Sequence, residues 1–167
     1  MERRRPANLL RAAALAPVLA GQTAAAFAAC PIELAVYEEP QTGAGIDFRP
    51  GGNATASNAF RMVLGKGLVL DGFVMWSGAR PVAMLTHDCP EGDATAQELA
   101  ACTLWEGVVY AVDGRGEAGL LPAEGEDAPL SLILSDLGRA PRLLSLLDAT
   151  AAGVAPGDIF SLSGCQE

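Results

Sequence analysis

Short hydrophobic runs, separated by glycine, proline and small polar residues, cover most of the chain beyond residue 30. Most of the runs are four to eight residues long and rich in Val, Ile, Leu and aromatic residues, which is typical of β-strands. They predict strands at 32–37, 46–49, 60–64, 68–70, 73–76, 81–85, 105–112, 119–121, 130–134 and 159–162.

The segments between these runs carry turn and helix signals. Gly65-Lys66-Gly67 lies between two runs and predicts a hairpin, whereas the small polar residues of 53–58 predict a surface loop. Short helices are expected at 94–101 and 142–147. The pattern therefore predicts a mainly antiparallel β protein, a sandwich or a partly open barrel, with one or two short helices.

The start of the chain has the three parts of a secretory signal peptide. Arginines at 3–5 precede an Ala- and Leu-rich stretch at 9–20, and Ala26-Phe27-Ala28 offers small residues to signal peptidase. Arg11 and Pro17 interrupt the apolar stretch, which argues against a membrane anchor. We therefore expect residues 1–28 to be a helical signal peptide and residues 29–167 to form one domain.

Twin-arginine export and lipidation are the two alternatives for this segment. The adjacent arginines raise the twin-arginine export route, but Pro6 follows them directly, which favours the general secretory route. Lipidation of Cys30 would need cleavage just before it, and Phe27 stands where such sites carry Leu. Cleavage without lipidation remains the favoured outcome, so no stable membrane anchor is expected afterwards.

The charge balance narrows the choice of partners. The chain has a net charge of −9, and residues 1–28 carry four arginines and one glutamate, so residues 29–167 carry −12. A field of this sign repels nucleic acid and anionic lipid headgroups. It argues against a nucleic-acid partner and favours a cationic or envelope protein.

The cysteines indicate the compartment. Four remain after the signal segment: Cys30, Cys89, Cys102 and Cys165. An even number in an exported chain predicts two disulfides, and we favour Cys89–Cys102 with Cys30–Cys165 among the three connectivities. A zinc site is disfavoured because the chain has one histidine and no CxxC pair. The expected location is periplasmic or secreted, in a bacterium.

One motif is typical of nucleotide-binding sites, but the residues that follow it are not. Residues 114–119 fit the pattern G-x-G-x-x-G, which in dinucleotide-binding proteins opens a helix. Leu120, Leu121 and Pro122 follow instead of a helix, and Asp113-Gly114 is a hairpin-turn signal. We therefore expect a β-turn here and no cofactor.

The densest polar cluster is His87 to Asp93, which holds the only histidine. His87, Asp88, Glu91 and Asp93 are the candidate binding surface, and Asp88, Glu91 and Asp93 form a weak calcium candidate. If the strand continues, His87 and Cys89 share a face and Asp88 is opposite. A polar turn in which Asp93 caps a helix starting at Ala94 is the favoured structure.

The aromatic residues are expected in the core. Trp76 and Trp105, with Phe60, Phe73 and Tyr110, belong to strand-like runs. An exposed aromatic platform for glycan or peptide binding is the alternative.

Four strings support a resemblance: 71–76, 87–93, 100–105 and the ending 158–165. Together they resemble small exported proteins of alphaproteobacteria. The resemblance covers most of the chain after the signal segment. It implies a bacterial periplasm and no particular chemistry.

No convergent catalytic set stands out in the sequence, and no G-x-S-x-G elbow is present. We therefore expect a non-enzymatic binding or accessory module of the cell envelope. Two alternatives are a secreted enzyme inhibitor, whose cysteine-closed loop enters an enzyme cleft, and a hydrolase that uses His87 with nearby carboxylates.

Overall fold

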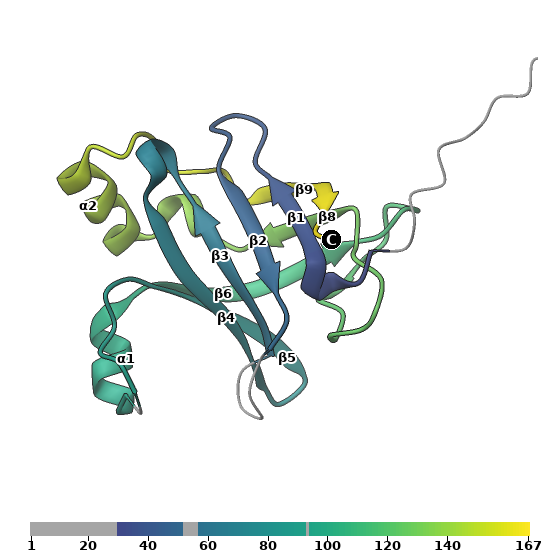
Figure 1. Cartoon of the computed structure of the whole chain (residues 1–167), viewed down its shortest axis with the longest axis horizontal. Helices are drawn as coiled ribbons and strands as arrows, with labels where there is room; N and C mark the ends of the chain where they lie inside the picture. The colour runs from purple at the N-terminus through teal and green to yellow at the C-terminus, as the bar shows by residue number, and fades with distance from the viewer. Residues whose placement is uncertain (1–29, 52–56, 93) are drawn as a thin grey trace, which may run out of the picture.

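The computed structural model describes residues 30–51, 57–92 and 94–167, so the segment predicted to be a signal helix lies outside it. Eight antiparallel strands form a barrel (Figure 1). The strands are β1 Ala35–Glu38, β2 Gly45–Arg49, β3 Ser57–Val63, β4 Val69–Ser77, β5 Arg80–Thr86, β6 Thr103–Val112, β8 Ser131–Leu134 and β9 Ile159–Cys165, with a ninth, β7 Ala118–Leu120, attached to β6. The other elements are the 3₁₀ turns η1 Ile32–Leu34, η2 Gly65–Gly67 and η3 Leu137–Arg139, and the helices α1 Ala96–Cys102 and α2 Pro141–Thr150.

The barrel is closed, which corrects the expectation of a sandwich or a partly open barrel. The strand order is β5-β4-β3-β2-β1-β9-β8-β6, and β6 also pairs with β5. The ten residues of β6 make this possible, because Thr103–Val108 pair with β5 and Val109–Val112 pair with β8. Sandwiches and barrels share the same alternating strand pattern, so closure was not visible in the hydrophobic runs.

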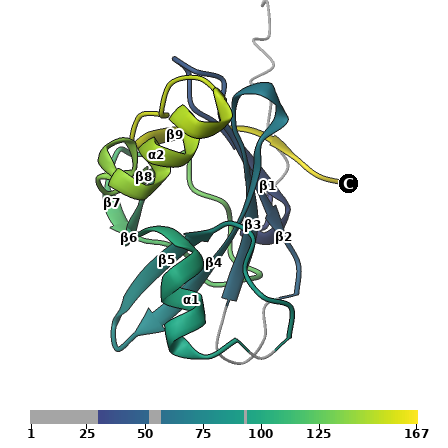
Figure 2. The same cartoon turned by 90° about the vertical axis from the view of Figure 1, so that its left-hand side faces the viewer.

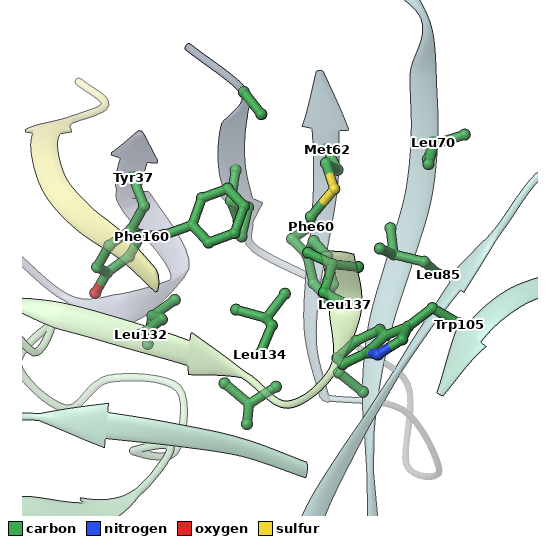
Figure 3. Close-up of a cluster of buried hydrophobic side chains, with 14 of the residues drawn as sticks. Tyr37, Phe60, Met62, Leu70, Leu85, Trp105, Leu132, Leu134, Leu137 and Phe160 are labelled. Atoms are coloured by element: carbon green, nitrogen blue, oxygen red, sulfur yellow. The ribbon is translucent and has the colours of Figure 1, made fainter. Parts of the chain in front are cut away.

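Side chains fill the interior of the barrel. Alternate residues of the strands point inward, and those of β3, Asn58, Phe60 and Met62, are all buried. Figure 3 shows the buried cluster with Trp105 and Phe160. The two buried polar aromatics have partners, since the Tyr37 hydroxyl donates to Pro129 O at 3.0 Å and Trp105 Nε1 to Ser135 O at 3.0 Å.

Three of the five aromatic residues predicted for the core are only partly buried. Phe60 and Trp105 are buried as expected, but Trp76 is 43% exposed, Tyr110 is 40% exposed and Phe73 is half-buried. Tyr110 alternates with buried Val109 and Ala111 on β6 and so faces outward. Hydrophobic character alone does not determine which face of a strand is covered.

Several element boundaries differ from the predicted ones. Residues 32–34 form η1, and the strand begins only at Ala35. The predicted loop at 53–58 gives way to β3 at Ser57, and residues 52–56 lie outside the description. The runs 68–70 and 73–76 belong largely to one strand, β4, which continues through Gly72, where an added Cβ would meet the Phe60 ring.

Both helices lie on one side of the barrel (Figures 1 and 2). α2 begins with Pro141 at its first turn and buries Leu143 and Leu147 against the core. Among the helices that the structure describes, none is long and apolar enough to span a membrane.

Two disulfides are present, with the favoured pairing: Cys30–Cys165 and Cys89–Cys102. The first joins Cys30, which lies just upstream of η1, to Cys165 at the end of β9, and the second joins cysteines 13 positions apart in the sequence. Disulfides persist in oxidising environments, so the pair indicates an extracellular compartment.

Candidate functional site

The predicted polar cluster lies where the chain leaves the barrel between β5 and α1. The main-chain amide of His87 donates to Cys102 O at 3.1 Å, and Cys89 is joined to Cys102 with 5.3 Å between the Cα atoms. The beginning of the loop is therefore tied to the end of α1. We call residues 87–102 the disulfide-closed segment.

His87 and Asp88 form the only polar pair described within the cluster. His87 Nε2 lies 3.4 Å from Asp88 Oδ2, and the Asp88 side chain is 89% exposed. An exposed pair of this kind contributes little to stability. β5 ends at Thr86 and Asp88 has a φ of 51°, so the strand does not continue through residues 87–89. Within the described part of the chain, no serine, threonine or cysteine side chain hydrogen-bonds to the imidazole.

Of the other two carboxylates of the calcium candidate, the structure describes Glu91 alone. Glu91 is exposed and precedes Gly92, whose φ of 92° makes the turn. Asp93 lies outside the described residues, so the calcium candidate Asp88, Glu91 and Asp93 is not described as a set. The rest of the chain, as far as the structure describes it, holds no group of three His, Cys, Asp or Glu side chains suited to a metal.

Thr95, not Asp93, caps α1, and the helix begins at Ala96 rather than Ala94. Glu98 N donates to Thr95 Oγ1 at 3.3 Å while Glu98 Oε2 accepts from Thr95 N at 2.8 Å, a reciprocal capping box. Hydrogen bonds from the Thr95 amide and hydroxyl lower the pKa of Glu98. The T-x-x-E signal of this capping box is present in the sequence at 95–98.

A cleft of about 500 Å³ lies beside the disulfide-closed segment. Its walls come from α1 and from β5 and β6, and Arg142 of α2 completes it. Arg142 Nη1 donates to Ala100 O and Thr103 O, both at 2.7 Å, which fixes the end of α1 against α2. The lining residues are Met84, Ala96, Leu99, Ala100, Thr103, Leu104, Trp105, Glu106 and Arg142. Sequence reasoning missed Arg142, because nothing local connects residue 142 to residue 100.

A second groove, of about 490 Å³, lies beside the hairpin that joins β6 to β7. The G-x-G-x-x-G motif forms the predicted β-turn. Asp113 Oδ1 accepts from the amides of Glu117 and Arg115, and Gly116 supplies the positive φ of 82°. These bonds lower the pKa of Asp113. Asp113, Glu117 and Asp127 line this groove together with apolar side chains.

A scan against protein-family models finds no match, and neither a search of curated proteins nor a search of solved structures finds a similar chain.

Proposed function

We propose that this protein is a non-enzymatic binding or accessory module of the bacterial envelope that acts in the periplasm. The observation that carries the proposal is the cleft of about 500 Å³ beside the disulfide-closed segment. A cleft of this size accommodates a small ligand or a few side chains of a partner.

The wall of this cleft is already ordered. α1 is fixed by the Cys89–Cys102 bond, by the Thr95–Glu98 capping box and by the two hydrogen bonds from Arg142. A partner that docks here need not order α1, so less binding free energy is lost. Loops and short helices held on a rigid scaffold are where binding surfaces concentrate.

The charge of the surface favours a cationic partner. Glu106 is exposed in the cleft, and Asp88 and Glu91 are exposed on the loop that the Cys89–Cys102 bond ties to the end of α1. Arg142 is the only cation among the lining residues, and it already donates to two carbonyls. The exposed carboxylates would therefore attract a positively charged partner and speed its association.

Site-specific photo-crosslinking in the periplasm tests the proposal. A photoreactive amino acid at Gln97, exposed on α1, is compared with the same amino acid at Arg49, which is exposed at the end of β2. We expect discrete adducts from position 97 alone, with a lower yield when Asp88→Asn and Glu91→Gln are added. Equal adducts from both positions, or none from position 97, contradict the proposal. A folded His87→Ala protein that loses a measured hydrolytic activity supports the hydrolase instead.

A further inference from the structure

β7 is an edge strand of the sheet. It pairs with β6, and within the part of the chain that the structure describes no other strand lies against it. All three of its residues, Ala118, Gly119 and Leu120, are exposed. Native edge strands are kept short, carry lysine or proline, or are covered by another segment. β7 is short, with three residues, but it contains neither lysine nor proline.

The hydrogen-bond pattern shows which groups face the open edge. Asp113 N donates to Glu117 O at 3.0 Å at the start of the hairpin. Hydrogen-bonded and non-hydrogen-bonded pairs alternate in antiparallel strands, so Ala111 and Gly119 form the next bonded pair. The N–H and C=O groups of Ala118 and Leu120 therefore point away from β6 and can pair with an added strand.

Apolar side chains continue from this edge over the outer face of the barrel. The register places Leu120 beside Tyr110, Tyr110 beside Ile133, and Ile133 beside Ile159. Leu120 is 44% exposed, and Ile159 is 55% exposed. An added strand would extend this row of side chains by one position, and its own apolar residues would pack against Leu120.

The charges around the edge select the kind of partner. The residues that line the groove include the carboxylates of Asp113, Glu117 and Asp127 and no lysine or arginine. Arg115 forms ion pairs with Asp113 and Glu117, both at 3.0 Å. A second copy of this chain would bring the same carboxylates against them and would be repelled. A segment that carries lysine or arginine is attracted instead.

We propose that β7 binds an extended segment of another protein, with alternating basic and aliphatic residues, as an additional strand of the sheet. The aliphatic residues continue the row that begins at Leu120, and the basic residues meet Glu117 and Asp127. Strand addition of this kind takes its affinity from main-chain hydrogen bonds and its specificity from alternate side chains. The inference shares with the proposed function only the assumption that the protein is a binding module, since it concerns a separate surface.

A synthetic probe tests the inference directly. An N-acetylated nine-residue peptide of alternating valine and lysine is titrated into the oxidised, ¹⁵N-labelled protein, and a valine–glutamate peptide serves as the control ligand. We expect the lysine peptide to slow amide hydrogen exchange at Ala118 and Leu120 by at least about tenfold, because both amides become hydrogen-bonded. The glutamate peptide should leave both rates unchanged.

Two pairs of variants test separately the main-chain hydrogen bonds of β7 and the carboxylates beside it. Ala118→Pro removes the amide that faces the open edge, and Ala118→Val keeps it, so only the proline variant should bind the peptide at least about tenfold more weakly. Glu117→Gln with Asp127→Asn should also weaken binding, whereas Glu38→Gln with Asp148→Asn, exposed elsewhere, should not.

Absence of binding to the wild-type protein overturns the inference. Binding without protection of Ala118 and Leu120 overturns it as well, and the charge variants decide the question if Ala118→Pro does not fold. Crosslinks from Gln97 in the proposed-function experiment would persist in either case. Failure at β7 is thus distinguishable from failure of the binding module as such.

Discussion

Glu39 is the most deeply buried charged residue that the structure describes, at 2% exposure. Its carboxylate accepts from Thr42 Oγ1 at 2.6 Å, Thr42 N at 2.8 Å and Gln41 N at 3.0 Å. Burial raises the pKa of Glu39, but these bonds and one from the Gly157 amide outweigh it and leave the pKa below its ordinary value of 4.5. The carboxylate thus joins the β1–β2 turn to the segment before β9.

Glu39→Gln should lower the free energy of unfolding at pH 7 by about 1–3 kcal/mol, because an amide is a weaker acceptor than a carboxylate and brings two donors. Since the pKa of the folded state is lowered, the contribution of Glu39 is complete above about pH 4.5 and is lost as the pH falls through the folded-state pKa. Urea unfolding at pH 7 and pH 3 should show a smaller loss for the variant than for wild type. Glu38→Gln, on the exposed neighbour, should behave like wild type, and equal pH dependence of Glu39→Gln and wild type would contradict the prediction.

Position 72 requires glycine because the Phe60 side chain packs closely against it, and not because the backbone turns there. A Cβ at this position would collide with the ring of Phe60, its cross-strand partner. Gly72→Ala should therefore destabilise the protein by about 1–3 kcal/mol, as overpacking does. Gly119→Ala is the matched control, because its Cβ would have no neighbour within 4 Å. A similar urea midpoint for both variants would refute this account.

At the residue scale, a local turn could be predicted from the sequence, whereas the exposure of a side chain could not. The turn at Asp113 followed from Asp-Gly next to a strand-like run, because that signal is local. The exposure of Tyr110 did not, because it depends on which face of β6 the rest of the barrel covers. Thr95 and Asp93 both suit an N-cap, and only the position of Glu98 distinguishes them.

At the scale of elements, local pairings were predictable and distant ones were not. The hairpin around Gly65-Lys66-Gly67 joins β3 to β4 as expected, since both strands and the turn are adjacent in the chain. The pairing of β1 with β9 joins residues more than 120 positions apart, and no local signal selects it. The cleft of the candidate site depends on such distant neighbours, which is why its Arg142 wall was missed.

Arg142 gives a test of how α1 is held. Arg142→Ala removes both hydrogen bonds to Ala100 O and Thr103 O, so the end of α1 should open more readily. We expect amide hydrogen exchange in α1 to accelerate about fivefold, which corresponds to about 1 kcal/mol. Arg139→Ala loses ion pairs with exposed Asp136 and half-buried Asp158, neither of which belongs to α1, and should change these rates little. Unchanged exchange in Arg142→Ala would show that the disulfide and the capping box suffice.

At the scale of the whole molecule, the β-rich character and the disulfide pairing could be predicted, but closure could not. Composition and turn spacing are the same for a sandwich and a barrel. Closure depends on β6 being long enough to pair with β5 and then with β8, and on β9 returning beside β1. Cys165 lies opposite Ala35 in that last pairing, so the Cys30–Cys165 bond lies at the seam between the first and last strands.

The position of this bond predicts that the two disulfides contribute unequally. The β1–β9 seam has four register pairs and is interrupted by an irregularity between Val36 and Tyr37. The Cys30–Cys165 bond closes a separation of 135 residues, and the Cys89–Cys102 bond closes one of 13. The loop-entropy relation gives about 5 kcal/mol for the first and about 3 kcal/mol for the second.

Urea unfolding of Cys30→Ala/Cys165→Ala should therefore show the larger loss of stability, with β1 and β9 amides exchanging faster than those of β4 and β5. Cys89→Ala/Cys102→Ala should instead loosen α1 and leave the seam protected, because its bond lies outside the barrel wall. A larger global loss in that second variant would mean that the disulfide-closed segment, rather than the seam, limits the stability of the barrel.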